Sequence, residues 1–209
     1  MKHLFTTWCL AASALTVQAQ VRQTLTSPNG QVKIEINADK KLVFNVIDNG
    51  KTLLQGEASM LLEGIKASQY ISTSTQSVKE HFDAPNYKIT SFDDEYNQMK
   101  VKNKNGVNVE FRAYNSGVAY RFITTSSKGE WTAKDDFTAY LPYSTNEKNP
   151  KAMAFQATYD VASLSHSKPL EAFLPATVDC KTAKVTLMET DVENYPGMFV
   201  KGEKNSLTA

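Results

Sequence analysis

The sequence predicts an all-β protein: a large antiparallel β-sandwich with at most a few short helical turns. Apolar and polar residues alternate along much of the chain, which is typical of strands with one buried face. Turn signals recur about every ten residues, as they do in antiparallel sandwiches. No stretch longer than about twelve residues keeps apolar side chains at the helical spacing i, i+3, i+4 and i+7.

The first elements form a hairpin pattern. Residues 31–37 alternate between aliphatic and polar side chains and predict a strand. Residues 42–47 predict a second strand, which runs into the turn sequence Asp48-Asn49-Gly50-Lys51. Because Asn-Gly favours a two-residue hairpin turn, residues 52–54 are expected to return beside residues 42–47.

The middle of the chain repeats this pattern. Val107, Val109 and Phe111 are expected to face one side of a strand, because alternate residues share a face. The turn at 115–117 is expected to need a positive φ angle, which glycine supplies. Strands are predicted over residues 87–89, 96–101, 107–111 and 118–123, with turns at 103–106 and 115–117.

The N-terminus has the features of a secretory signal. Lys2 and His3 precede an apolar run from residue 4 to 17, and Val17-Gln18-Ala19 fits a cleavage site. Residues 1–19 are therefore predicted to be a signal peptide, residues 20–209 the mature domain, and the product periplasmic or extracellular. Cys180 is then the one remaining cysteine, so the core and not a disulfide must stabilise the fold.

The charge balance excludes binding by bulk charge. Lys and Arg number 23 and Asp and Glu 22, which gives no large field to hold nucleic acid or a membrane surface. No second hydrophobic span follows the signal. We therefore expect neither nucleic acid nor, after cleavage, a membrane as a partner.

Local catalytic motifs of hydrolases and nucleotide binders are absent from the sequence. The acidic clusters 93–95 and 135–136 are interpreted as solvated turns, and Cys180 as a small buried hydrophobe. His81 and His166 are single histidines for which a structural or surface role is favoured. A mutarotase-like enzyme using His81, His166 and Glu171 is disfavoured, because no acid and base are evidently paired, but spacing does not exclude it.

Aromatic residues cluster in one third of the chain, near Asn146, Glu147 and Asn149. Flat rings beside amides can stack on a sugar, whereas alternating aromatics more often fill a sandwich core. Both interpretations stay open. The cluster comprises Trp131, Tyr140, Tyr143, Phe155 and Tyr159.

The segment 185–199 carries the most distinctive acidic pattern. A predicted strand delivers Glu189, Asp191 and Glu193 in succession to a Tyr-Pro-Gly corner. A carboxylate at the end of a strand is well placed to reach an ion or substrate at a domain edge. A short helical turn is expected at 191–194, with Thr190 as its cap. Pro196 would prevent the turn from continuing into a helix.

Four segments of this chain resemble glycoside hydrolase family 97, the secreted α-glucosidases and α-galactosidases. The most specific is Phe-Arg-Ala-Tyr-Asn-x-Gly-Val-Ala-Tyr-Arg-Phe at residues 111–122. Together the segments span nearly all of the mature chain, in the order of the family's N-terminal domain. They are residues 25–30, 50–54, 111–122 and 189–198.

The resemblance implies a sandwich of the galactose-mutarotase type, packed against a catalytic (β/α)8 barrel in the same polypeptide. The family's catalytic carboxylates lie on the barrel, beyond Ala209, so this chain alone is expected to be inactive. The resemblance further implies that this domain forms a wall of the pocket for an α-linked oligosaccharide. It also implies one glutamate ligand for calcium, Glu189 or alternatively Glu193.

Two functions therefore stand as hypotheses. The first is the non-catalytic N-terminal domain of a calcium-dependent exo-acting α-glycosidase, of α-glucosidase or α-galactosidase type. The second is a self-standing secreted module that binds carbohydrate through its aromatic residues. Calcium requires about six to eight oxygen ligands, so one carboxylate should bind it weakly if at all in this chain alone.

Overall fold

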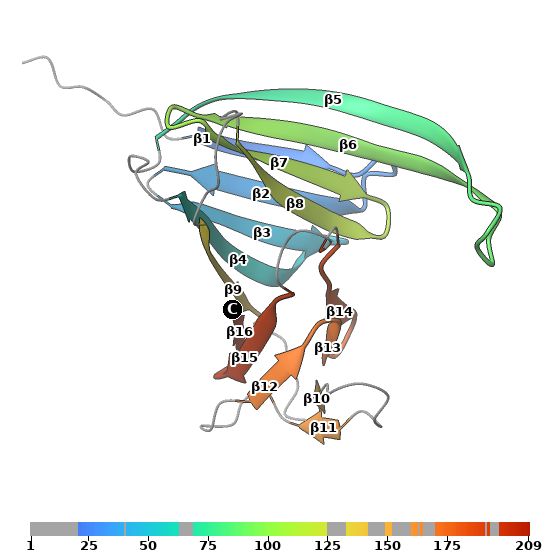
Figure 1. Ribbon diagram of the computed structural model, residues 1–209, viewed down its shortest axis with the longest axis vertical. Helices are drawn as coiled ribbons and strands as arrows, with labels where there is room; N and C mark the ends of the chain where they lie inside the picture. The colour runs from blue at the N-terminus through green and yellow to red at the C-terminus, as the bar shows by residue number, and fades with distance from the viewer. Residues whose placement is uncertain are drawn as a thin grey trace, which may run out of the picture.

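The protein is an all-β structure, and no helix occurs in the part that the computed structural model describes (Figure 1). That part comprises residues 21–39, 41–62, 69–124, 133–141, 149–151, 160–162, 164, 170–190, 192 and 197–209. The strands are β1 (Val21–Thr26), β2 (Val32–Ala38), β3 (Leu42–Asp48), β4 (Lys51–Leu62), β5 (Tyr70–Asp83), β6 (Ser91–Asn103), β7 (Val107–Tyr114), β8 (Gly117–Thr124), β9 (Ala133–Tyr140), β10 (Asn149–Lys151), β11 (Asp160–Ala162), β12 (Leu170–Phe173), β13 (Ala176–Asp179), β14 (Lys184–Leu187), β15 (Phe199–Glu203) and β16 (Ser206–Thr208).

Two large antiparallel sheets form the sandwich. The eight-stranded sheet has the order β1-β2-β3-β4-β9-β16-β15-β12, and the four-stranded sheet has the order β5-β6-β7-β8. Aromatic side chains join the two sheets: the ring of Phe44 on β3 lies 5.6 Å from that of Phe111 on β7 and 5.5 Å from that of Tyr120 on β8. The predicted antiparallel sandwich is confirmed.

The predicted hairpins are largely confirmed. Asp48 pairs with Lys51, and the turn residues Asn49 and Gly50 have φ angles of 47° and 80°, as an Asn-Gly turn requires. Val107, Val109 and Phe111 are buried on the same face of β7, between the sheets.

The turn at 115–117 differs from the prediction. None of its three residues is among the described residues that have a positive φ angle. Instead, the Asn115 side chain accepts a hydrogen bond of 2.9 Å from the backbone N–H of Asn29, in the turn between β1 and β2. This turn therefore contacts a residue 86 positions away in sequence, and local turn preferences cannot predict such a contact.

The hairpin of β5 and β6 also differs from the prediction. Tyr87, Lys88 and Ile89 lie in the loop between these strands and not in a strand, and residues 93–95 lie in β6 and not in a turn. β5 was not predicted, because its serines and threonines do not alternate with apolar residues. Pairing of β7 with β6 begins at Tyr96, so the far end of the hairpin has no third strand beside it.

Cys180 is fully buried and free, as the sequence predicted. Burial raises the pKa of its thiol above the ordinary value, which disfavours the reactive thiolate. The predicted signal peptide and most of the predicted helical turn at 191–194 lie outside the described residues.

Gly56 makes a close approach that a larger residue would prevent. It lies opposite Phe44 in the β3–β4 ladder, and a Cβ atom at Gly56 would overlap the ring of Phe44, which is itself buried between the sheets. Gly56→Ala is therefore expected to lower the free energy of unfolding by about 1–3 kcal/mol in urea denaturation. Gly117→Ala is the matched control, because no atom lies within 4 Å of its added Cβ. Equal effects of the two substitutions would contradict this explanation.

Candidate functional site

Glu189 lies where β14 leads toward β15, and it joins the two segments. Its Oε2 atom accepts a hydrogen bond of 2.8 Å from the backbone N–H of Met198, one residue before β15. A bond to an ionised acceptor is stronger than one between neutral groups. The carboxylate therefore links the residues on either side of segment 190–197. Within this segment, Asp191 and residues 193–196, including the alternative ligand Glu193, lie outside the described residues.

The Glu189 carboxylate fits a single metal ligand but not a complete metal site. A carboxylate has about four acceptor positions on two oxygens, and the bond to Met198 uses one of them. Among the described residues, no group of three or more His, Cys, Asp or Glu side chains could hold a metal ion. A calcium ion at Glu189 would therefore need most of its oxygen ligands from elsewhere.

Apolar side chains border this corner. Phe199, next to Met198, is 60% exposed, and its ring centroid lies 4.5 Å from that of Phe173 on β12. Met188, next to Glu189, is 71% exposed. An exposed ring that packs on a second ring, as Phe199 does on Phe173, is typical of a surface that another domain or a ligand covers.

The structure describes only part of the other predicted site residues. Tyr140 lies on β9 and is 39% exposed, so it is not a core residue. Glu171 is exposed on β12 and lies 3.8 Å from Lys201 on β15. Trp131, Tyr143, Phe155, Tyr159 and His166 lie outside the described residues, as do the side chains of Asp135 and Asn149.

His81 has partners that its sequence neighbourhood did not reveal. It lies on β5 opposite Asp93 on β6, with 2.7 Å between Nδ1 and the Asp93 Oδ1 atom, and Nε2 lies 3.6 Å from Asp83. The hydrogen bond with His81 lowers the pKa of the Asp93 carboxyl below its ordinary value. All three side chains are exposed, so this is a surface interaction of the hairpin and not an enclosed acid–base pair.

His81→Gln is expected to raise the pKa of Asp93, because the neighbour that stabilises the carboxylate is lost. The lowered pKa means that this interaction stabilises the fold above the pKa of the unfolded chain and is lost as the pH falls through the folded pKa. NMR titration of the Asp93 carboxyl carbon in both proteins measures the change. An unchanged midpoint would show that His81 is not its cause.

A cluster of charged side chains around the buried Glu110 lies on the four-stranded sheet and is not apparent from the sequence. Glu110 on β7 is only 2% exposed, and its Oε1 atom lies 3.1 Å from Arg112 and 2.9 Å from Arg121. Lys100 lies 3.7 Å from its other oxygen, and the Arg112 guanidinium lies 4.4 Å from the centre of the Tyr96 ring. Only the strand register reveals this cluster, since it sets Lys100 and Arg121 on either side of Glu110.

Among the described residues, no helix is long and apolar enough to cross a membrane.

The family profile described as Glycosyl-hydrolase 97 N-terminal matches residues 25–209. The chain belongs to glycoside hydrolase family 97. This family 97 domain is 31% identical to the retaining alpha-galactosidase of Bacteroides thetaiotaomicron, in an alignment that covers 99% of this chain and 34% of that enzyme.

Solved structures share the fold of this family 97 domain. A family 97 enzyme of Pseudoalteromonas in complex with acarbose has a TM-score of 0.75 at 18% identity, covering 90% of this chain and 31% of that enzyme. A beta-arabinopyranosidase has a TM-score of 0.73 at 17% identity, covering 90% and 35%. The domain thus spans about a third of the length of these relatives.

Proposed function

We propose that this chain is the non-catalytic N-terminal domain of a calcium-dependent, exo-acting α-glycosidase that works in the periplasm or outside the cell. The observation that carries the proposal is the match of residues 25–209 to the family's N-terminal domain, within relatives about three times as long. The predicted signal peptide at residues 1–19 supports the location.

The substrate in this proposal is an α-linked oligosaccharide. The relative from Bacteroides thetaiotaomicron is a retaining alpha-galactosidase. The Pseudoalteromonas enzyme was solved in complex with acarbose, and a variant of that enzyme was solved in complex with panose. These names support both α-galactosidase and α-glucosidase types. Glycosidic cleavage needs two carboxylates that flank the scissile bond, and we place both in a catalytic barrel that belongs to the same polypeptide in the whole enzyme.

The domain's own contribution is assigned to the Glu189 corner. Glu189 would supply one carboxylate to the calcium ion, and its bond to the Met198 N–H would hold that carboxylate in place. Calcium, when bound, supplies positive charge beside the reacting sugar. Phe199, Phe173 and Met188 would form part of the wall between this domain and the substrate pocket.

The chain alone is expected to hydrolyse neither 4-nitrophenyl α-galactoside nor 4-nitrophenyl α-glucoside. Calorimetry should show calcium binding no tighter than about millimolar, because one carboxylate supplies too few ligands. Hydrolysis by the purified chain would overturn the proposal.

The same calorimeter decides the second candidate, a self-standing carbohydrate-binding module. The Phe173–Phe199 pair, in which Phe199 is 60% exposed, favours it, since exposed rings can stack on sugars. Binding of maltooligosaccharides or galactosides by the chain alone, lost in Phe199→Ala, would support the module. Absence of binding leaves the enzyme-domain proposal in place.

A further inference from the structure

The four-stranded sheet has an outer face, which consists of the side chains that point away from the eight-stranded sheet. Met99, Val101 and Phe111 are buried and define the inner side, so their sequence neighbours point outward. Along β5 and β6, the outer face consists of the pairs Ser72–Lys102, Ser74–Lys100, Gln76–Gln98, Val78–Tyr96, Glu80–Asp94 and Phe82–Phe92.

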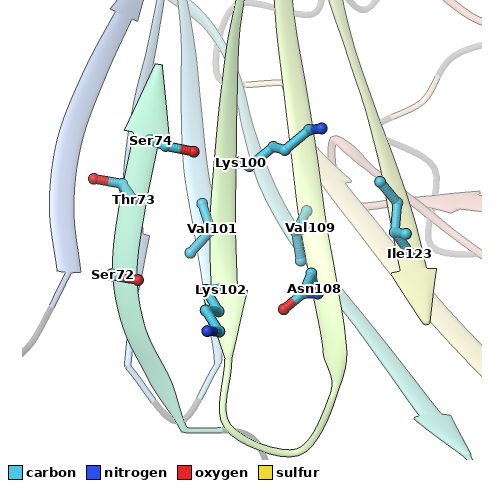
Figure 2. A pocket seen from close by; sticks show the side chains of 9 residues that line it. All are labelled: Ser72, Thr73, Ser74, Lys100, Val101, Lys102, Asn108, Val109 and Ile123. Carbon is cyan, nitrogen blue, oxygen red and sulfur yellow. The ribbon is translucent and has the colours of Figure 1, made fainter. Parts of the chain in front are cut away.

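One end of the outer face is basic and hollowed. The hollow has a volume of about 300 Å³. Figure 2 shows the side chains that line it. Lys100, Lys102 and Arg121 are exposed at this end, and the one acid in the same rows, Glu110, is buried beneath its cationic partners. This end therefore presents positive charge around a depression. The outward side chains that line the hollow are those of Ser72, Ser74, Lys100, Lys102, Asn108 and Ile123.

The other end of the outer face is acidic and aromatic. Phe82 and Phe92 stack with their centroids 5.5 Å apart and are 41% and 50% exposed. Glu80 and Asp94 lie in the adjacent row. These residues lie on the part of the β5–β6 hairpin that projects beyond β7 (Figure 1). A two-stranded ribbon is marginally stable by itself, and exposed stacked rings on it are typical of a contact surface.

We propose that two copies of this chain associate through this outer face. In this dimer the two outer faces meet with their strands antiparallel, and the two-fold axis lies between the Gln76 and Val78 rows. The Phe82–Phe92 stack of one copy then lies over the hollow of the other. The same axis places Glu80 and Asp94 over the row of Lys100. Each copy gives and receives the same contacts, as a closed two-fold dimer requires.

Charge and size both favour a second copy as the occupant. Each acidic row meets a basic row, so both ends of the interface have complementary charge. The eleven residues from Ser72 to Phe82 extend about 33 Å along the strand, so the face is long enough for both of its ends to meet a second copy at once. The Phe82–Phe92 stack is apolar and the hollow has room for a ring edge.

Reversing the charge at one end at a time tests the dimer. One variant carries Glu80→Lys and Asp94→Lys. The other carries Ser74→Glu and Lys102→Glu, which leaves Lys100, Arg112 and Arg121 around Glu110. In sedimentation equilibrium, the wild-type chain should dimerise and each variant alone should dimerise about tenfold more weakly or not at all.

An equimolar mixture of the two variants should dimerise more strongly than either variant alone, because in the mixed pair Glu80→Lys faces Ser74→Glu at one end and Asp94 faces Lys100 at the other. The pair Lys33→Glu and Glu35→Lys, exposed on β2, is the control and should dimerise as the wild type does. Circular dichroism confirms that each variant is folded.

Three results would overturn the dimer. The first is a wild-type chain that stays monomeric up to about 100 µM, well above the Kd range of specific interfaces. The second is a dimer that neither variant weakens, or one that the mixture does not form more strongly than either variant alone. The third is a dimer lost in Phe199→Ser but not in the charge variants, which would place the contact at the Glu189 corner.

Discussion

Replacing both Arg112 and Arg121 with methionine is expected to lower the free energy of unfolding by about 3–5 kcal/mol, because a buried carboxylate then loses its partners. Glu110 is 2% exposed, and its Oε1 atom lies within 3.1 Å of both guanidinium groups. Lys100, at 3.7 Å, compensates only in part. Methionine keeps much of the apolar contact of Arg112 with the Tyr96 ring, so charge is the main change.

The matched control removes the charge that causes the cost. Adding Glu110→Gln to the double variant should recover about half or more of the lost stability, since a neutral amide is much less costly to bury than a carboxylate. Glu110→Gln alone should cost less than the double variant, because both arginines are partly exposed and can be solvated. Chemical denaturation measures all four proteins. A triple variant less stable than the double would contradict this explanation.

Glu189→Gln is expected to raise the calcium concentration needed for half-maximal hydrolysis by about tenfold or more, because an ionised ligand is lost. The test protein joins this domain to the remainder of the Bacteroides thetaiotaomicron relative, which this chain matches over 34% of its length. Glutamine keeps an acceptor for the Met198 N–H, so the corner itself should persist.

Two substitutions make this measurement specific. Glu171→Gln removes an exposed carboxylate that lies near Lys201, and it should leave the calcium requirement unchanged. Glu193→Gln tests the alternative ligand. If Glu193→Gln raises the calcium requirement and Glu189→Gln does not, the ligand assignment moves to Glu193.

The sequence predicted the parts of the fold that local pattern controls. Alternation predicted the buried face of β7, and Asn49-Gly50 predicted the turn between β3 and β4. β5 could not be predicted from its own residues, because it forms through thirteen pairs with β6 and not through apolar alternation. The conformation of the turn at 115–117 could not be predicted from its own residues either, because Asn115 contacts Asn29, which is 86 positions away in sequence.

The contacts of the candidate site residues could not be predicted from sequence spacing. The resemblance to the family, in agreement with the strand-end pattern, indicated Glu189, but its hydrogen bond with the Met198 N–H spans nine positions and required the structure. The Phe173–Phe199 pair and the partners of Glu110 depend on strand register, which sequence spacing does not reveal. His81 was interpreted as a lone histidine because its partner Asp93 lies across the hairpin.

The most direct test of the proposed function is the hydrolysis of 4-nitrophenyl α-galactoside by three samples. It asks whether this chain is a non-catalytic domain that an α-glycosidase needs for activity. The samples are this chain, the remainder of the Bacteroides thetaiotaomicron relative without its matching N-terminal third, and the two joined in one polypeptide. We expect calcium-dependent activity only from the joined protein. Activity of this chain alone, or equal activity of the remainder with and without it, would contradict the proposed function.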